Sequence, residues 1–284
     1  MLDSFTQLWG SPADTAPGDM LAVEVAGQLA GGAAYRMAEG EPGLWLTGVA
    51  VLPERRRRGV GAQAYRALED VLRRRGTRRL LAGVTGDSPA GQGFAARQGF
   101  EEVGGTITYQ LDSAAADRAG WGDPQQLVAA QGLRLARLDR FPRRGLAERL
   151  LPLWNRTRPD QPQPWPFVPY SARRLEQEML APDAVALPHS FVIVTPSNQI
   201  IALALSAQLA ADCLASIYLA VDPEFRGRGL ALALKRQLII HAQEQAIAAL
   251  LAENDRRNCA MRAINQRLGY RPLSKRLVYQ RALE

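Results

Sequence analysis

Two stretches decide the fold of this chain: VAVLPERRRRGVG at residues 49–61 and LAVDPEFRGRGLA at residues 219–231. They lie 170 residues apart, and seven of their thirteen aligned pairs are identical. The same offset pairs further segments: LAVEV from Leu21 with FVIVT from Phe191, Gly99-Phe100 with Gly269-Tyr270, and Tyr109-Gln110 with Tyr279-Gln280. Because this register is kept without net gaps, the sequence predicts two copies of one domain.

Each copy has the same order of predicted elements. A β-hairpin comes first, at residues 21–37 in copy one and 191–206 in copy two. A strand then ends at Val51 or Val221, and a basic, glycine-containing loop leads into an amphipathic helix. A buried strand, a second helix and a last strand follow. The order β-β-β-α-β-α-β predicts a mixed sheet with helices in each copy.

The two copies differ at their N-terminal ends. The strand-like GLRLARL at residues 132–138 reads as the start of copy two, well before its hairpin, whereas copy one has only 20 residues before Leu21. We therefore expect three parts: an N-terminal domain at 1–113 that lacks the first strand and helices, a linker at 114–131, and a C-terminal domain at 132–284. The proline-rich stretch 158–170 cannot be a regular helix. Its aromatic residues, Trp165 among them, predict an ordered loop.

Composition excludes several classes of protein. The 284 residues are 47% hydrophobic and 22% charged, which is typical of a folded domain rather than a disordered chain. No apolar stretch is long enough to span a membrane, and the N-terminus lacks the pattern of a secretory signal. Two unpaired cysteines fit a reducing compartment, so we expect a cytoplasmic protein. Two distant histidines exclude a His-rich metal site, and we expect no bound metal.

The net charge is +7, and arginine supplies nearly all the positive charge. One interpretation is nucleic-acid binding. The other is an anionic small ligand held by guanidinium groups. Composition alone does not choose between them.

The loop between strand and helix is where ligand chemistry is expected. A helix N-terminus presents unpaired N–H groups and a partial positive charge, and glycines allow a ligand to approach the backbone. Together with arginines, these features make a pyrophosphate site. The alternative for the run 55–58 is a solvated charged surface, but such a surface has no reason to recur at the same point of a repeat.

The repeated motif is R-x-x-G-x-G/A after V-x-P, and with it the chain resembles the GNAT acetyltransferases, in particular those with two GNAT domains in tandem. The resemblance covers nearly the whole chain. It implies an α/β (α+β) fold with two tandem GNAT-like domains, each a mixed, mostly antiparallel sheet flanked by helices. It also implies acetyl-CoA as cofactor, with the loop amides on its pyrophosphate and the preceding strand along its pantetheine arm. The implied contact residues are Val49, Ala50, Val51, Arg56, Arg57, Arg58, Gly59, Val60 and Gly61 in copy one, and Leu219, Ala220, Val221, Arg226, Gly227, Arg228, Gly229, Leu230 and Ala231 in copy two.

The sequence departs from the family at the proton donor. Many members have a tyrosine four residues before the Gly-Phe of the second helix, and a phenol suits protonation of the leaving thiolate. Ala95 and Asn265 stand at these positions here. The resemblance implies that Asn258 and Asn265 contact the pantetheine or thioester region, although helix capping explains Asn258 equally well. Tyr218 is a further donor candidate, for which a packing role is simpler.

The proton acceptor is not fixed by the sequence. Glu253, at the end of a strand, and Glu24, in the first hairpin, are candidate bases, and positioning of the amine alone is the alternative. Because copy two keeps the region 139–190, which in this fold builds the acceptor pocket, we expect turnover there.

The first interpretation is therefore an acetyl-CoA-dependent N-acetyltransferase that acts on a small amine. The second is a non-enzymatic acyl-CoA-binding or sensing protein, and the third, a nucleic-acid-associated protein, rests only on the charge. We expect neither nucleic acid nor membrane as a partner. We also expect a monomer, because a tandem pair can make within one chain the pairing that single-domain relatives make between subunits.

Overall fold

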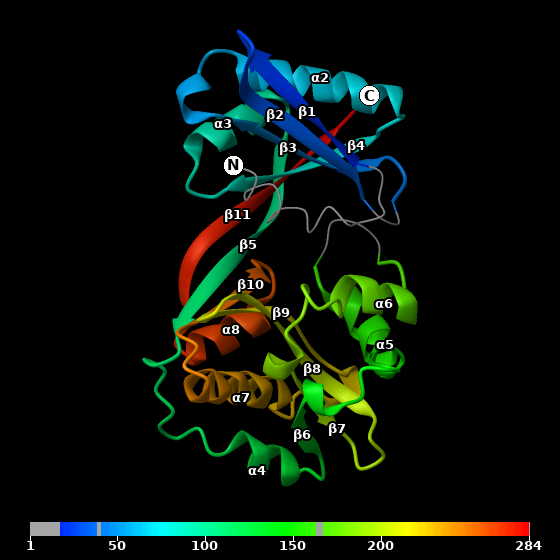
Figure 1. Ribbon diagram of the computed structural model, residues 1–284, viewed down its shortest axis with the longest axis vertical. Helices are drawn as coiled ribbons and strands as arrows, with labels where there is room; N and C mark the ends of the chain where they lie inside the picture. The colour runs from blue at the N-terminus through cyan, green and yellow to red at the C-terminus, as the bar shows by residue number, and fades with distance from the viewer. Residues whose placement is uncertain (1–17, 39–40, 163–166, 284) are drawn as a thin grey trace. The chain divides into compact units, whose positions relative to one another are not determined.

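The computed structural model describes residues 18–38, 41–162 and 167–283. These residues form two compact units (Figure 1). Unit 1 holds residues 18–38, 41–106, 167–168 and 275–283, and unit 2 holds residues 107–162 and 169–274. No helix of the described chain is both long and apolar enough to cross a bilayer.

Unit 1 is built on the hairpin of copy one. Its strands are β1 (Gly18–Val25), β2 (Gln28–Met37), β3 (Leu44–Val51) and β4 (Arg79–Thr85), joined by the short helix η1 (Pro53–Arg55), α2 (Val60–Arg74) and α3 (Pro89–Arg97). β1, β2 and β3 are antiparallel, and β3 and β4 are parallel. Helix α2 packs on the sheet through Ala64, Leu68 and Leu72, all fully buried. This is the stripe that a period of 3.6 residues predicts.

Unit 2 has the same core and additional elements before it. The strands are β6 (Arg134–Arg137), β7 (Phe191–Val194), β8 (Ile200–Ala210), β9 (Cys213–Val221) and β10 (Ala249–Asp255). The helices are α4 (Pro124–Ala129), α5 (Leu146–Thr157), α6 (Ala172–Met179), α7 (Leu230–Glu244) and α8 (Cys259–Arg267), with short turns η2 (Leu138–Arg140), η3 (Arg158–Asp160), η4 (Leu187–His189) and η5 (Pro223–Phe225).

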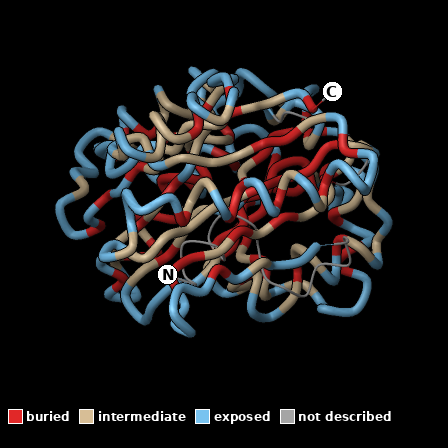
Figure 2. The backbone as a smooth tube through the Cα atoms, turned by 90° about the horizontal axis from the view of Figure 1, so that it is seen from above, coloured by how far each residue is buried: buried red, intermediate tan, exposed pale blue. Residues whose placement is uncertain are grey.

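Both faces of the unit 2 sheet are covered. Along β7, Phe191 and Ile193 pack in the cluster that contains α7, while Val192 and Val194 pack in the cluster that contains α5 and α6. This alternation is the period of two that a strand imposes, and it explains why FVIV is apolar throughout. Figure 2 shows the buried segments in red along the inner strands and pale blue exposed segments outside them.

The last strand of each copy belongs to the other unit. β11 (Arg271–Ala282) ends copy two, yet its residues 276–282 pair antiparallel with β4 of unit 1. β5 (Glu101–Asp112) ends copy one, yet its second half lies beside β10 in unit 2. Accordingly, Tyr109 packs in the core of unit 2 and Tyr279 in the core of unit 1. The strand order is β1-β2-β3-β4-β11 in unit 1 and β5-β10-β9-β8-β7-β6 in unit 2.

The mixed, mostly antiparallel sheet with flanking helices is confirmed in both units. Unit 1 has no counterpart of β6, α5 or α6 among residues 18–38 and 41–106. Within the predicted linker 114–131 the structure places α4, whose Val128 is fully buried against unit 2. The boundaries 1–113, 114–131 and 132–284 remain a prediction about the duplicated sequence, since the compact units exchange their final strands. Trp165 lies outside the described residues.

Candidate functional site

The two glycine loops have the same backbone conformation. Gly229 (φ 77°) and Gly59 (φ 80°) precede the helices α7 and α2, and both lie in the left-handed region that favours glycine. Two positions earlier in the motif, Gly227 (φ 74°) corresponds to Arg57 (φ 61°). Space is open where a Cβ would stand on Gly59, Gly227 and Gly229. The loops therefore expose backbone to a ligand without a side chain in the way.

The amides of these loops are available. In the described chain, the backbone N–H groups of residues 227–231 and 57–61 donate to no protein acceptor. Unpaired N–H groups at the start of a helix attract anions through hydrogen bonds and the helix dipole. Both loops can therefore hold a phosphate group with the backbone alone.

The first arginine of each motif has an internal role. Arg226 Nε donates to the carbonyl oxygen of Val221 at 3.1 Å, and Arg56 Nε donates to that of Val51 at 3.1 Å. Each guanidinium thus ties its loop to the end of the preceding strand. The resemblance implies that Arg56 and Arg226 also contact the ligand, and this stays a prediction beside the observed contact with the strand.

The strands that lead to the loops separate from their parallel neighbours. β9 pairs with β10 from Cys213 and Ala249 to Ser216 and Ala252, and residues 217–221 have no partner on β10 in the described structure. In unit 1, β3 pairs with β4 only as far as Thr47 and Ala82. Residues 49–51 and 219–221 therefore have no strand partner on one backbone edge, next to the glycine loop. Apart from the Val51 and Val221 carbonyls, which accept from Arg56 and Arg226, an extended ligand can pair with this edge.

The separation differs between the units in one respect. In unit 2, Leu205 pairs with Tyr218 and Ser206 with Ser216, so Ile217 is an extra residue in β9. Such a bulge bends a strand and increases its twist. In unit 1, β2 and β3 keep a regular register from Gly31 and Val51 to Met37 and Trp45. Of the two strands that lead to the glycine loops, β9 has a bulge at the point where it separates from β10, whereas β3 has none.

Ion pairs tie the unit 2 loop to α5 and η3. Arg156 contacts the buried Asp222 at 2.9 Å and Glu224 at 3.3 Å. Arg226 also pairs with Asp160. Asp222 accepts a hydrogen bond from the backbone of Glu224, which caps η5. Sequence reasoning missed this network, although Asp222 sits inside the quoted motif where copy one has Leu52.

The asparagines on α8 have clear structural partners. Asn258 caps the helix, since its side chain accepts from the Met261 amide at 3.1 Å, as Ser88 does for Gly91 in α3. Asn265 is fully buried, and its Nδ2 donates to Asn254 Oδ1 at 2.6 Å. Its Oδ1 has no partner within the described residues. Capping of Asn258 is thus observed, and a cofactor contact stays a prediction for both asparagines.

Tyr218 is held in place by packing. Its hydroxyl lies 2.8 Å from Thr157 Oγ1, and its ring stacks on Trp154 with centroids 4.3 Å apart. Burial raises the pKa of Tyr218, and the hydrogen bond with Thr157 only partly opposes that rise. A buried phenol with a raised pKa that is already hydrogen-bonded is a poor proton donor.

The two candidate bases occupy different places. Glu253 is exposed on β10, directly after the last residue that pairs with β9, and Thr108 Oγ1 of β5 donates to its Oε2 at 3.4 Å. Glu24 lies on β1, two strands away from β3 in unit 1. The structure brings Glu253 to a strand separation and leaves Glu24 remote from the one in its own unit. Thr108 was not foreseen, because only the strand exchange places it beside β10.

Comparison with known proteins gives a family match over most of the chain. The sequence model of the acetyltransferase (GNAT) family matches residues 3–100 and 143–270. No curated protein sequence is significantly similar to the chain.

The fold is similar to solved structures at low sequence identity. A GCN5-related N-acetyltransferase from Sphaerobacter thermophilus has a TM-score of 0.70 at 15% identity, over 99% of this chain and 85% of that one. A tandem GNAT protein of the clavulanic acid biosynthesis pathway, without acetyl-CoA, has a TM-score of 0.72 at 18% identity, over 99% and 87%. A glucosamine N-acetyltransferase region of a fungal multi-domain β-N-acetylglucosaminidase has a TM-score of 0.72 at 14% identity, over 98% and 36%.

Proposed function

Because the chain belongs to the GNAT family of acetyltransferases, we propose that it transfers an acetyl group from acetyl-CoA to the amine of a small molecule, in unit 2. The observation that carries this proposal is the separation of β9 from β10 beside the glycine loop 226–231. A free strand edge that ends at unpaired helix amides fits a ligand with amide groups and a diphosphate.

The residues present fit this cofactor. The amides of residues 227–231 would hold the diphosphate, and the free edge of 219–221 would accompany the pantetheine arm. When bound, acetyl-CoA supplies an activated acetyl thioester. The chain itself orients the two reactants, since the bulge at Ile217 and the ion pairs of Arg156 and Arg226 fix the shape of the site.

Glu253 takes up the proton that the attacking amine must lose. Its exposed carboxylate stands where β10 leaves β9, and Thr108 orients it. Asn265 carries an amide, which can hydrogen-bond but not donate a proton to a thiolate. Positioning and proton removal therefore account for the catalysis that unit 2 performs.

Unit 1 keeps the loop and the strand separation but has a regular β3 and, in residues 18–38 and 41–106, no acceptor helices. We assign it cofactor binding without turnover. A second function, acyl-CoA sensing, is favoured by one observation: Ala95 and Asn265 occupy both proton-donor positions, and both are buried.

A product assay separates the two functions. The protein is incubated with acetyl-CoA and, in turn, polyamines, amino sugars and amino-acid derivatives, and acetylated amines are detected by mass spectrometry. We expect the wild type to acetylate one of these classes of amine. Gly229→Asp should lose this activity, and Gly229→Asn should keep it. Acetyl-CoA binding without any acetylated amine would favour the sensing function.

A further inference from the structure

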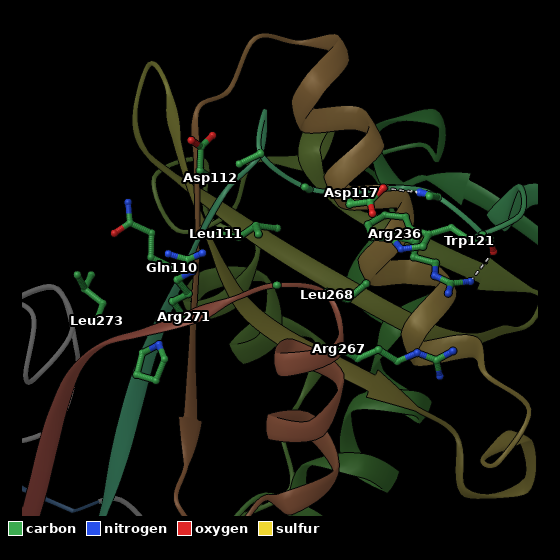
Figure 3. Close-up of a pocket in the computed structure, with 16 residues that line it drawn as sticks. Gln110, Leu111, Asp112, Asp117, Trp121, Arg236, Arg267, Leu268, Arg271 and Leu273 are labelled. Atoms are coloured by element: carbon green, nitrogen blue, oxygen red, sulfur yellow. Dashed lines mark hydrogen bonds between the residues drawn. The ribbon is translucent and has the colours of Figure 1, made fainter.

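Unit 2 contains a hollow of about 740 Å³ that the proposed reaction does not use (Figure 3). Its walls come from the end of β5, residues 115–121, α7, the end of α8 and the start of β11. No residue of the glycine loop 226–231 lines it. The hollow is therefore separate from the proposed cofactor site.

Three guanidinium groups line this hollow. Arg236 and Arg267 come from the helices α7 and α8, and Arg271 comes from β11. In Figure 3, Arg236 and Arg267 lie on one side of the view and Arg271 on the other, with Leu111 and Leu268 between them. None of the three arginines has a carboxylate oxygen within ion-pair distance among the residues described.

Arg236 is unusually enclosed. Only 8% of the residue is exposed, its Nη1 donates to the Trp121 carbonyl at 2.6 Å, and its guanidinium lies 5.3 Å from the Trp121 ring centroid. Its Nε has no partner in the part of the chain that is described. Burial, with the like charge of Arg267, lowers the pKa of Arg236. Two guanidinium groups thus lie close enough to repel each other, and neither forms an ion pair with a described carboxylate.

The carboxylates of the hollow are engaged elsewhere. Asp112 Oδ1 accepts the Ala114 amide at 3.0 Å, and Asp117 Oδ1 accepts the Ala119 amide at 2.8 Å. Both bonds stabilise turns in the segment after β5. Both carboxylates keep their charge, but three guanidinium groups against two carboxylates leave the walls with a net charge of +1 beside an aromatic and aliphatic surface.

Copy one has no such concentration of charge. At the 170-residue offset, Arg66 and Arg97 correspond to Arg236 and Arg267, but Glu101 stands where copy two has Arg271. Arg66 is exposed, whereas Arg236 is covered by Trp121. Among the residues that the structure describes, the third arginine and the aromatic cover are features of unit 2 alone.

We propose that this hollow binds a small organic anion, with a carboxylate or phosphate on the arginines and an apolar body against Trp121 and Leu268. Guanidinium forks match both oxyanions, and a volume of this size accommodates a small molecule. The site is independent of acetyl transfer.

Isothermal titration of the full chain with phenyl phosphate, benzoate and inorganic phosphate tests this proposal. Phenyl phosphate or benzoate should bind saturably, at least about tenfold more tightly than inorganic phosphate, and the stronger of the two identifies the acid group. Arg267→Gln and Arg271→Glu, the latter restoring the copy one residue, should each weaken binding about tenfold or more. Arg97→Gln, the matched change in unit 1, should have no effect.

Two results would overturn the proposal. One is no saturable binding of the aromatic probes at millimolar concentration. The other is binding that survives Arg267→Gln and Arg271→Glu, because it then belongs to the glycine loops. Quenching of Trp121 fluorescence, absent in Trp121→Phe, provides a second readout in variants that remain folded.

Discussion

Lys235 should be a neutral amine inside the folded protein at physiological pH. The residue is 1% exposed on α7, and its Nζ lies 4.4 Å from the Tyr270 ring centroid with no hydrogen-bond acceptor in the described structure. Burial lowers the pKa of Lys235 from 10.5 to about 7. At the same point of copy one, Tyr65 satisfies its hydroxyl with Arg281 Nη1 at 2.6 Å.

The sign of the pH dependence follows from this difference. Between pH 7 and 10.5 the unfolded chain holds a proton on Lys235 that the folded chain has released, so stability rises with pH. The cost of burying the Lys235 amine, which lowers the free energy of unfolding, is fully present below pH 7 and vanishes above pH 10.5. With these two pKa values, the destabilisation by Lys235 amounts to about 4 kcal/mol at pH 7 and about 1 kcal/mol at pH 9.5. Replacement by Met, which keeps the volume and removes the charge, should therefore stabilise the protein by about 3 kcal/mol more at pH 7 than at pH 9.5.

The chain has only two lysines, which makes the assay direct. In protein labelled with ¹³Cε-lysine, NMR should show one resonance that titrates near pH 7, and Lys235→Met should remove that resonance. Urea unfolding of Lys235→Met and of the control Lys275→Met at both pH values then measures the linkage. The reasoning is refuted if the Lys235 resonance titrates near pH 10.5, or if the advantage of Lys235→Met does not change with pH.

Three further predictions follow from other sites. Arg57→Gly should raise the free energy of unfolding by about 0.5–1 kcal/mol in thermal or urea denaturation, because Arg57 has a φ of 61°; an unchanged or lower stability contradicts this. His189 Nδ1 and His241 Nε2 lie 2.9 Å apart, and burial lowers the pKa of both histidines, so the free energy of unfolding should fall as the pH drops below 6.5. Urea titrations at pH 7 and pH 5 should show a larger fall for the wild type than for His189→Asn. Glu253→Gln should lower kcat by about a hundredfold near neutral pH, and Thr108→Val should cause a smaller loss of kcat; a kcat of Glu253→Gln like that of the wild type would exclude Glu253 as the base.

The repeat made most of the fold predictable. The offset of 170 residues located both glycine loops and the helices behind them, because the same local pattern produces the same local structure twice. The same similarity between the copies made the strand exchange unpredictable. Tyr109 and Tyr279 occupy equivalent positions, so no local feature tells which sheet each final strand completes.

The candidate site was predictable in outline and less so in its side chains. Backbone amides and glycine conformations follow from the motif, whereas the partner of a long side chain depends on elements distant in sequence. Arg226 reaches Val221 and Asp160, and Asn265 turns to Asn254. The buried pairing of Asp222 with Arg156 likewise joins residues 66 positions apart. The sequence pattern of a single loop does not predict contacts of this kind.

The most direct test of the account is calorimetric titration of acetyl-CoA into a pair of variants that have the same side-chain shape but different charge at one loop position. Gly229→Asp and Gly229→Asn have nearly the same shape, and both residues tolerate a left-handed backbone, but only Asp places a negative charge beside the proposed diphosphate site. For two unit charges about 8 Å apart at an effective dielectric constant of 20, that repulsion is about 2 kcal/mol, or roughly thirtyfold in Kd. The account predicts this loss for Asp, near wild-type binding for Asn, and no change at the unit 2 site in Gly59→Asp. Equal binding by the Asp and Asn variants, or no binding by the wild type, would contradict it.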